Sequence, residues 1–472
     1  MNVFKARVIP ILVLVLIEGC NSVTTSDKKS NFLIILADDA GYADFGFMGS
    51  ADLQTPNIDR IADHGVYLTD AHTTASVCSP SRAGLLTGRY QQRFGHENNS
   101  PPHGFGMDPS ETTIADLLKP NGYKTALFGK WHLGDTDEFH PNNRGFDEFW
   151  GFLGGHRSYF PDENYDKPGS HTAIQHNGNY TTFSGYLTDV LGDKTGAFIG
   201  QNKDHPWFAF LSFNAVHTPM QATEEDLLHF EGHPRQKLAA MTWAMDRAVG
   251  KVLTKLETEG IMENTMIFFF SDNGGPSSTN TSINLPLKSQ KGYEFEGGHR
   301  VPFVIQYLQV VEGGGKFNAL TSTFDVFPTI MNVAGIPESD GKALDGVDLL
   351  PFIKGEETGS PHEDLYWRIG PWSAARLNNY KLILAKNADT ALYNLDVEIG
   401  EVSNLKGENP TDYQMMLDKL SNWEKGLIEP AWSGDQGWLN FKYFMYQDLI
   451  HNRKPRFNTR REVKNYLEEN EK

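Results

Sequence analysis

Acidic and amide side chains follow two apolar runs of the sequence, each at the point where the run ends. Asp38 and Asp39 come directly after the first such run in the body of the chain. Asp272 and Asn273 come directly after a later one. Alone, Asp38-Asp39 also suits a turn or a helix cap, but adjacent buried carboxylates repel unless a cation lies between them. Together the two strand ends predict an all-oxygen site for a hard cation, calcium or magnesium.

Basic side chains and imidazoles follow two further apolar runs. Lys130 and His132 come after one of them, and His217 comes after the other. Lysine neutralises the oxygens of an anion, and histidine moves a proton to or from a reacting group. Since parallel strands end at one edge of a sheet, where open α/β sheets bind ligands, we expect these side chains to meet the carboxylates there.

The sequence contains two cysteines, Cys20 and Cys78. Cys20 falls in the N-terminal signal-like segment, so the body of the chain cannot form an internal disulfide and Cys78 needs another explanation. Ser79 suits an N-cap and Pro80 the first position of a helix, which places Cys78 at a helix N-terminus that favours anions. Cys78 can be interpreted either as a small buried core residue or as a thiolate nucleophile.

The apolar runs have the length and composition of buried parallel strands. They cover residues 32–37, 125–128, 207–213 and 266–271, and helical patterns cover residues 56–64, 112–118 and 239–259. This alternation predicts an α/β fold in which a large, mixed, mostly parallel sheet lies between layers of helices. We expect this catalytic domain to span residues 20–355.

The pattern of apolar and polar residues changes after residue 355. Short alternating runs at 365–369, 374–377, 380–384 and 391–395 are typical of antiparallel strands, with Asn378-Asn379 as a hairpin turn. A helical pattern covers residues 410–428, and the charged tail after His451 has the composition of a peripheral segment. The sequence therefore predicts a smaller C-terminal α+β subdomain, residues 356–472, that contains an antiparallel sheet.

The first residues have the pattern of an export signal. Lys5 and Arg7 precede an apolar stretch that is too short to span a bilayer permanently. The stretch ends at Cys20, and residues 17–20 resemble a bacterial lipobox, in which the cysteine is acylated. We expect a signal peptide at residues 1–19 and a periplasmic or outer-membrane-anchored lipoprotein, with an ordinary cleaved signal peptide as the alternative.

The chain has 472 residues and a formal net charge of −18 at pH 7. Such a surface repels nucleic acid and other polyanions at long range. Nothing in the sequence has the footprint of a nucleic-acid-binding protein. An anionic substrate would therefore need a local cluster of positive charge.

Several motifs together resemble the type I, formylglycine-dependent sulfatases of the alkaline phosphatase-like superfamily. The first is Cys78-Ser79-Pro80-Ser81-Arg82, which resembles the maturation signature in which a dedicated enzyme oxidises the cysteine to formylglycine. The others that match the family are Asp38-Asp39-Ala40-Gly41, Thr55-Pro56-Asn57-Ile58-Asp59, Gly129-Lys130-Trp131-His132-Leu133-Gly134, Gly145-Phe146-Asp147, Asp272-Asn273-Gly274-Gly275, Lys291-Gly292, Glu296-Gly297-Gly298 and Arg300-Val301-Pro302. The resemblance extends over nearly the whole chain.

This resemblance implies a role for each residue that matches. The implied calcium ligands are Asp38, Asp39, the modified Cys78, Asp272 and Asn273. Arg82 would fix the formylglycine, and the groups around the sulfate would be Lys130, His132, His217 and Lys291. A hydroxyl of the formylglycine hydrate would attack sulfur, His217 or Lys291 would protonate the leaving oxygen, and His132 would deprotonate the remaining hydroxyl. A formylglycine-generating enzyme is the implied maturation partner.

We expect the substrate to be a sulfated carbohydrate, an algal galactan such as carrageenan or its oligosaccharides. The sequence resembles marine bacterial polysaccharide sulfatases, and its loops contain His96, His156 and Arg157 as candidate substrate-binding residues, near aromatic residues such as Trp150. Ulvan and glycosaminoglycan fragments are the alternative substrates.

Two other classes of protein remain open. A formylglycine-dependent phosphonate or phosphodiester hydrolase would share the fold and the motifs. A lipid-anchored glycan-binding protein without activity would keep aromatic surfaces, but it would have no need of the strand-end residues. Two-zinc phosphatases are disfavoured, because Asp272 is followed by Asn273 where a histidine ligand would be needed.

Overall fold

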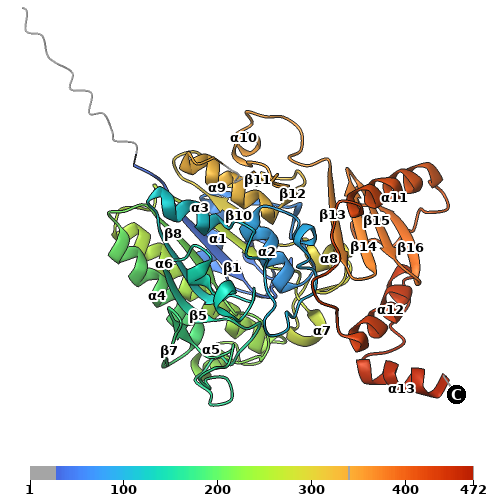
Figure 1. The fold of residues 1–472 in the computed structure, drawn as a ribbon, viewed down its shortest axis with the longest axis horizontal. Coiled ribbons are helices and arrows are strands. Elements are labelled where there is room, and N and C mark those ends of the chain that lie inside the picture. Colours follow the sequence, from blue (N-terminus) through green and yellow to red (C-terminus); the bar gives the residue numbers. More distant parts are fainter. Residues whose placement is uncertain (1–27, 338–340, 471–472) are drawn as a thin grey trace, which may run out of the picture.

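The computed structural model describes residues 28–337 and 341–470 and is shown in Figure 1. The predicted export signal, with Cys20, lies outside the described residues. Among the residues that are described, no helix is both long enough and apolar enough to cross a membrane.

A ten-stranded sheet runs through the large region of the molecule. Its strands are β1 (Asn31–Ala37), β2 (Val66–Leu68), β4 (Lys124–Lys130), β5 (Glu148–Phe152), β6 (Gln175–His176), β7 (Asn179–Tyr180), β8 (Trp207–Ser212), β9 (Thr265–Ser271), β10 (Phe303–Gln306) and β11 (Gly315–Phe317). Their order is β11-β2-β10-β9-β1-β8-β4-β5-β6-β7. The central strands from β9 to β5 are parallel, and β10 is antiparallel to β9. The predicted mixed, mostly parallel sheet is confirmed.

The central strand β1 shows why these runs are continuously apolar. Every residue of β1 is buried, because both faces of the sheet are covered. Successive side chains alternate between the faces, so Leu33 enters one hydrophobic core and Phe32 the other. The register pairs Ala37 with Ser271 and Leu36 with Ser212. The residues that follow these strands therefore begin side by side.

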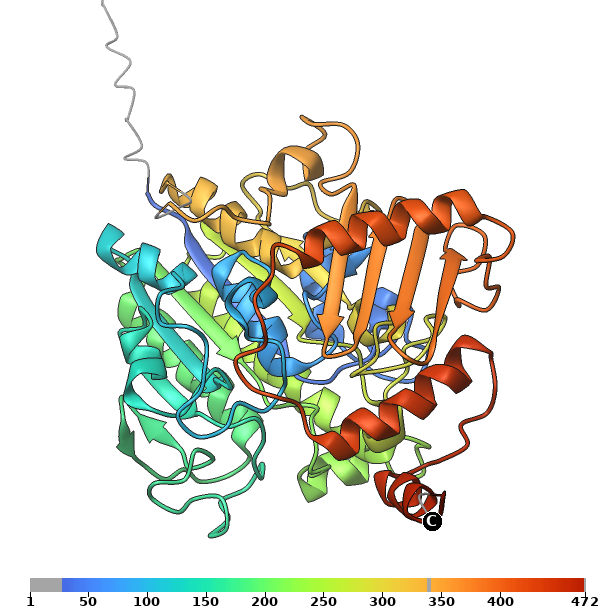
Figure 2. The same cartoon turned by 45° about the vertical axis from the view of Figure 1, so that its right-hand side comes forward.

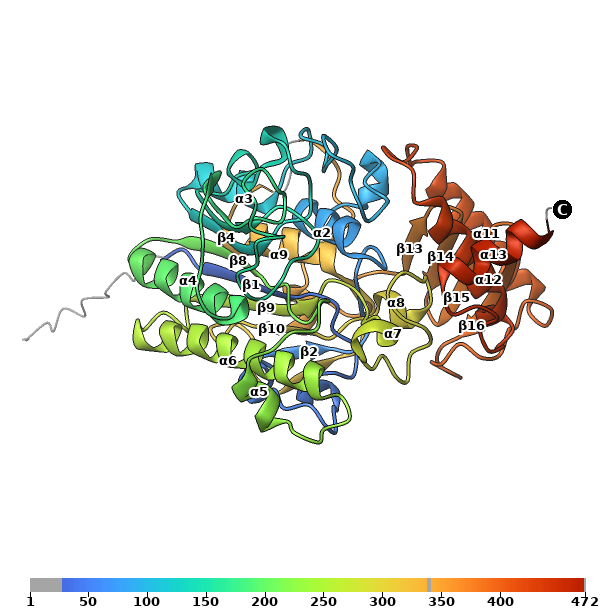
Figure 3. The ribbon, with the colours of Figure 1, turned by 90° about the horizontal axis from the view of Figure 1, so that it is seen from below.

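Helices cover both faces of the sheet, as Figure 3 shows. One layer comprises α1 (Pro56–Asp63), α4 (Leu187–Asn202), α5 (Glu224–His229) and α6 (Gln236–Thr258), and the other comprises α2 (Cys78–Thr87), α3 (Ile114–Leu118) and α9 (Val326–Ala334). The predicted start of α3 at residue 112 is wrong, because Thr113 and Asp116 form a capping box that begins the helix at Ile114. Helix α6 begins earlier than predicted, at Gln236.

Short elements connect these layers. They are β3 (Ala71–His72), β12 (Thr321–Ser322), α7 (Ser277–Asn280), α8 (Glu296–His299), α10 (Leu350–Ile353) and the 3-10 turns Gly46–Met48, Gln91–Phe94, Lys119–Asn121, Asp137–Phe139, Pro141–Asn143 and Thr323–Asp325. Strands β3 and β12 pair with each other in a two-stranded sheet.

The C-terminal part forms a separate four-stranded antiparallel sheet, shown in Figure 2. Its strands are β13 (Asp364–Ile369), β14 (Trp372–Leu377), β15 (Tyr380–Ala385) and β16 (Asp389–Asn394), and its helices are α11 (Pro410–Glu424), α12 (Gln436–Ile450) and α13 (Arg460–Asn470). The predicted hairpin between β14 and β15 is confirmed, with Asn378 at a positive φ of 51°. Helix α11 ends before the predicted residue 428, and α12 was not predicted although its Tyr446 is completely buried. The predicted domain boundary at residue 355 stays a prediction.

The C-terminal sheet shares a hydrophobic core with residues of the large region that lie outside its ten-stranded sheet. Val77, Tyr293 and Phe295 of the large region pack with Trp367 and Tyr446 of the C-terminal part. The indole of Trp367 also donates a hydrogen bond to Thr73 O at 2.7 Å. The C-terminal sheet is therefore fixed against the segment that leads into α2.

Buried charges reinforce this junction. Lys381 on β15 donates to Glu296 Oε1 at 2.8 Å and to His299 Nε2 at 2.7 Å, and the side chains of Lys381 and Glu296 are completely buried. Burial would raise the pKa of Glu296, but Lys381, followed by His72 and Arg376, holds that pKa well below its usual range. Each charge depends on its partners, because an isolated buried ion is strongly unfavourable.

We predict that Lys381→Met lowers the free energy of unfolding by about 3 kcal/mol or more, because Glu296 loses a buried partner. Chemical denaturation measures this change. The matched control is Lys419→Met, which removes an ion pair between β13 and α11 (Lys419 Nζ to Asp364 Oδ2, 2.9 Å) whose side chains are 39% and 31% exposed. The control should cost less than about 1 kcal/mol, and equal losses in both variants would contradict the prediction.

Candidate active site

Four neighbouring strands bring the predicted site residues to one edge of the sheet. In the order β9, β1, β8 and β4, these strands lead into Asp272, Asp38, His217 and Lys130, which is itself the last residue of β4. Asp39 has a positive φ of 66°, a conformation that departs from the extended strand. Consecutive carboxylates would otherwise point to opposite faces, and this turn lets Asp38 and Asp39 face the same site.

The three carboxylates at this edge are buried and lie close together. Asp39 N donates to Asp272 Oδ1 at 3.2 Å, and Lys130 Nζ lies 2.6 Å from Asp38 Oδ2. Burial, followed by the charge of Asp272, raises the pKa of Asp38 to about 7, although Lys130 opposes this shift. Burial also acts to raise the pKa of Asp39, but Lys291, followed by His217, holds it below its usual range. The three carboxylates therefore repel one another in this buried site, although neighbouring ammonium and guanidinium groups balance their charge.

These groups have the chemistry of a metal site. Asn273 Nδ2 donates to Asp39 Oδ1 at 2.7 Å, whereas Asn273 Oδ1 is buried without a hydrogen-bond partner among the described residues. One ligand atom from each of Asp38, Asp39, Cys78 and His217 lies within 4.8 Å of the others. Crowded carboxylates beside an unsatisfied amide oxygen fit a divalent cation, which would satisfy both.

Cys78 is the first residue of α2 and lies over the carboxylates. Its Sγ is 3.6 Å from Asp38 Oδ1 and 3.0 Å from Lys291 Nζ. The predicted cap is wrong by two residues: Val77 is the N-cap, because the Ser79 hydroxyl donates instead to His132 O at 2.6 Å. Burial, followed by the charge of Asp272, raises the pKa of the Cys78 thiol well above its usual range. Cys78 is thus a neutral thiol at neutral pH, which argues against its interpretation as a thiolate nucleophile.

Arg82 joins α2 to three strands. It lies one turn after Cys78, so both side chains occupy the same helix face. Its Nε and Nη2 donate to Asp272 Oδ2 at 3.0 and 2.8 Å, and its Nη1 donates to Ser212 Oγ at 2.5 Å and to Lys130 O at 3.2 Å. Because Arg82 is almost completely buried, these charge-assisted bonds fix the position of the Cys78 end of the helix.

The proton-carrying groups of the site differ in charge. Burial opposes the charged form of Lys291, but Asp39 raises its pKa well above the usual range, and Lys291 is an ammonium. Burial lowers the pKa of His217 to about 3, and burial followed by Lys130 lowers that of His132 well below its usual range. Lys291 therefore carries a proton and a positive charge, while His217 and His132 are neutral imidazoles.

The predicted substrate-binding residues divide into two groups. His156 is exposed, and its ring stacks on that of His217 with 6.1 Å between centroids. Arg157 is completely buried and donates to Thr172 O at 2.9 Å. His96 is also completely buried, with Nε2 2.7 Å from Ser79 Oγ. The structure corrects the prediction for Arg157 and His96, which bond within the protein, while His156 faces solvent. Trp150, offered with them as a sugar-binding aromatic, is a core residue of β5.

Other residues support the site without having been predicted. Ser212 Oγ donates to Lys130 O at 2.7 Å, Asn280 Nδ2 to Asp39 O at 2.9 Å, and Tyr159 OH to His217 O at 2.8 Å. Ser212 is a polar residue at the end of an apolar run, as Asp38 is, so the same sequence pattern could have identified it. Asn280 ends the short helix α7 and Tyr159 lies in a loop, and neither carries a comparable signal.

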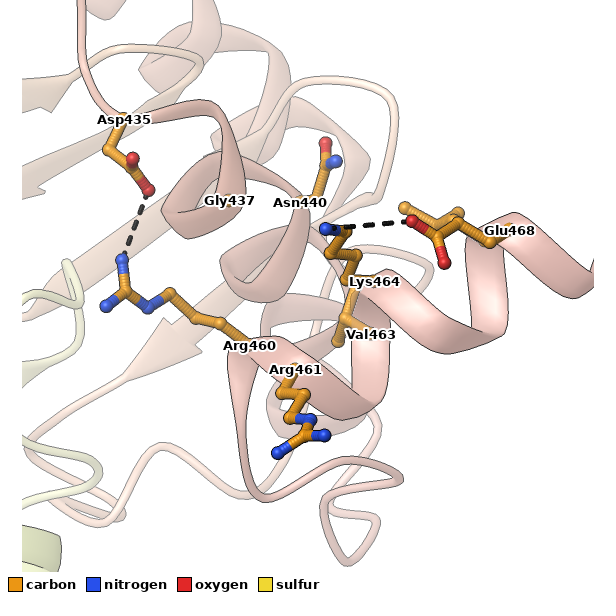
Figure 4. A pocket seen from close by; sticks show the side chains of 9 residues that line it. Asp435, Gly437, Asn440, Arg460, Arg461, Val463, Lys464 and Glu468 are labelled. Carbon is orange, nitrogen blue, oxygen red and sulfur yellow. Dashed lines mark hydrogen bonds and ion pairs between the residues drawn. The ribbon is translucent and has the colours of Figure 1, made fainter.

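A groove of about 640 Å³ lies apart from this edge, between α12 and α13 (Figure 4). Its charged side chains are largely paired with one another: Arg460 Nη1 is 3.3 Å from Asp435 Oδ1, and Lys464 Nζ is 3.7 Å from Glu468 Oε1. None of the strand-end residues lines this groove. The groove therefore lies outside the candidate active site at the strand-end edge.

Comparison with known proteins defines the family. The sequence model of the sulfatase family, described as "Sulfatase", matches residues 30–336. The chain is 33% identical over 380 residues to mouse N-acetylgalactosamine-6-sulfatase, covering 75% of this chain and 72% of the relative. It is 31% identical over 412 residues to human arylsulfatase G, covering 78% of each chain. The chain therefore belongs to the sulfatase family and is an enzyme that hydrolyses sulfate esters.

Among solved structures, that of the protein named Ps i-CgsB is similar, with a TM-score of 0.83, 35% identity, and coverage of 89% of this chain and 98% of that one. The same protein in complex with k-i-k-neocarrahexaose gives 36% identity and the same TM-score. The match extends beyond the family model into the C-terminal region, which supports the alkaline phosphatase-like fold with its small antiparallel sheet.

We predict that Cys78, when left as cysteine, is unreactive in the native enzyme because it is buried and its pKa is raised. In a Cys20→Ser background, a thiol reagent at pH 8 should label Cys78 at least about a hundredfold more slowly than it labels the unfolded chain. Mass spectrometry of the Cys78 peptide follows the reaction. Native labelling as fast as that of the unfolded chain would show that a thiolate is present and exposed.

Proposed function

We propose that this sulfatase removes sulfate from algal galactans such as carrageenan or their oligosaccharides. The observation that carries this proposal is the cluster of charged residues around Cys78, in which the ammonium groups of Lys130 and Lys291 can contact the oxygens of a sulfate. The likeness to Ps i-CgsB, a protein solved with a neocarrahexaose, supports a galactan as the carbohydrate. The exposed His156 beside His217 is suitably placed to contact the sugar.

We also propose that Cys78 is oxidised to formylglycine by a formylglycine-generating enzyme. Two observations support this modification: the sequence Cys78-Ser79-Pro80-Ser81-Arg82 and the neutral state of the thiol, which is a poor nucleophile. When present, a formylglycine hydrate supplies a hydroxyl group as the nucleophile. Arg82 and Lys291 lie where they can hold that group in position.

A calcium ion is the proposed metal, held by the oxygen atoms of Asp38, Asp39, Asp272 and Asn273 together with the modified Cys78. The raised pKa of Asp38 and the unsatisfied Asn273 Oδ1 support this set, because oxygen ligands suit a hard cation. When bound, calcium neutralises the carboxylates and polarises sulfate oxygens.

The remaining residues bind the ester and move protons. Lys130 and Lys291 bring ammonium groups that stabilise the sulfate oxygens. Lys291 carries a proton that it can give to the leaving oxygen, and His217 acquires the same ability when an anionic ester next to it favours the imidazolium. His132, which is neutral, accepts a proton from the group at position 78.

The proposed location is the periplasm or the outer membrane, with a lipid attached to Cys20. The lipobox-like residues 17–20 support an anchor of this kind. An anchored enzyme would meet polysaccharide fragments outside the cytosol, where calcium is also more available.

To test the proposed substrate, enzyme co-produced with a formylglycine-generating enzyme is incubated with carrageenan, ulvan and glycosaminoglycan oligosaccharides. Ion chromatography of released sulfate should show the fastest turnover on carrageenan oligosaccharides, and Cys78→Ala should lose activity by about a thousandfold or more, since it lacks the nucleophile. An aryl phosphate and an aryl sulfate are compared in parallel. Preference for the phosphate would indicate a phosphonate or phosphodiester hydrolase instead, and a faster release from ulvan or glycosaminoglycan would reassign the carbohydrate.

Calcium dependence is tested by metal removal. We predict that a chelator abolishes turnover, that calcium restores it, and that Asn273→Leu weakens calcium binding about tenfold or more because one oxygen ligand is lost. Calorimetric titration of calcium into the metal-free enzyme measures the affinity directly. Asn280→Leu, which removes an amide from the Asp39 carbonyl rather than from the ligand set, is the matched control. Stoichiometric zinc in the purified active enzyme would contradict this assignment.

A further inference from the structure

A single hydroxyl group links the two sides of the catalytic site. Ser79 follows Cys78 directly, and its Oγ lies 2.6 Å from the backbone oxygen of His132 and 2.7 Å from His96 Nε2. Ser79 and His96 are completely buried. The hydroxyl therefore joins α2, the loop after β4 and the loop that contains His96.

The donors and acceptors of this link can be assigned. A carbonyl oxygen only accepts, so the one hydrogen of the Ser79 hydroxyl goes to His132 O. His96 must then donate its Nε2–H to Ser79 Oγ. Burial lowers the pKa of His96 to about 3, so a neutral imidazole with its proton on Nε2 fits the contact. His96 thus fixes the direction in which the serine hydroxyl points.

His132 needs such a restraint. Its backbone has a positive φ of 63°, which is uncommon for a residue with a side chain. Its N–H donates to Leu153 O at 3.0 Å, and its carbonyl accepts from Ser79. The backbone of Gly155 lies so close to the His132 ring that a Cβ atom at Gly155 would be 2.6 Å from His132 Nε2. The backbone of His132 is thus held by hydrogen bonds at its N–H and its carbonyl, and Gly155 limits the space open to its ring.

We propose that His96 is a positioning residue for His132 and not a ligand of the substrate. Through Ser79 it sets the backbone of His132 relative to residue 78, and hence the distance over which His132 takes a proton. This inference rests on the proton-accepting role proposed for His132. It assigns a function to a buried histidine that has no access to the sugar.

The C-terminal region supports His96 from behind. The ring of Trp432 meets the His96 ring edge to face, with centroids 4.8 Å apart. Asn98 Nδ2 donates to Trp432 O at 2.6 Å, and Ala431 N donates to Gly95 O at 2.9 Å. Figure 2 shows the segment between α11 and α12 returning to the large region. The small subdomain therefore contributes to the geometry of the catalytic loop.

The test uses the full, formylglycine-bearing enzyme, with turnover expressed per formylglycine determined by mass spectrometry. His96→Leu should lower kcat on an aryl sulfate about tenfold or more, because small misplacements of a catalytic group are costly, while KM changes less than about twofold. His96→Gln, whose amide can still donate to Ser79, should recover most of the loss. Ser79→Ala, which keeps the maturation signature, should resemble His96→Leu.

A double-mutant cycle separates positioning from general damage. In a His132→Ala background, His96→Leu should cause no further loss of kcat, because the residue through which it acts is gone. His140→Leu is the matched control: His140 is also a buried neutral imidazole, held by Gln175 at 3.3 Å, and its loss should multiply with that of His132→Ala.

Three outcomes overturn the inference: unchanged turnover in both His96→Leu and Ser79→Ala, no recovery with His96→Gln, or losses from His96→Leu and His132→Ala that multiply. Full turnover by the single variant His132→Ala is a different result. It would refute the proposed role of His132 itself, and with it the basis of the inference.

Discussion

The repulsion among three buried carboxylates is the constraint on which the rest of this structure depends. Asp38, Asp39 and Asp272 meet at the ends of β1 and β9 with almost no exposure, an arrangement that is unstable without compensating charge. The compensation comes from separate parts of the chain: Arg82 from α2, Lys130 from β4 and Lys291 from a loop that precedes α8. No local segment can form this cluster alone, so the site exists only when the whole sheet and its flanking helix are assembled.

Much of the site could be predicted from the sequence, because its signal is local. Asp38, Asp272, Asn273 and Lys130 each follow or end an apolar strand, and parallel strands deliver such residues to one edge. What failed depends on tertiary contacts. Ser79 has the composition of an N-cap, yet its hydroxyl bonds to His132 O, a contact between distant segments that overrides the local preference. His96 and Arg157 have the polarity of loop ligands, but their burial is decided by packing that spacing does not reveal.

In the C-terminal region, too, elements with a local sequence signal could be predicted, and those that depend on tertiary contacts could not. The strands β13 to β16 and the turn at Asn378 follow from alternation and turn chemistry, and they were predicted closely. Helix α12 was missed, although Tyr446 on it packs against Trp372 with centroids 5.4 Å apart. Aromatic residues favour strands when judged by propensity alone, and only the shared core with Tyr293 and Phe295 shows why they form a helix here. That core also explains how a small subdomain can act on the active site, since its helices and the segment between them pack directly against the loops around Cys78.

The charge of the site also resolves the conflict between an acidic protein and an anionic substrate. The formal net charge of −18 repels a polyanion, but screening limits this repulsion to about 8 Å at physiological ionic strength. Within that distance the local balance decides. Among the described residues, Arg82, Lys130 and Lys291 match Asp38, Asp39 and Asp272 in number, so the cluster is close to neutral by itself. A divalent cation bound by the carboxylates would leave a positive excess in a buried place, where electrostatic interactions are strongest. A site that is neutral without metal and positive with it would bind a sulfate ester only after the metal, so the proposed calcium ion would serve substrate binding as well as chemistry.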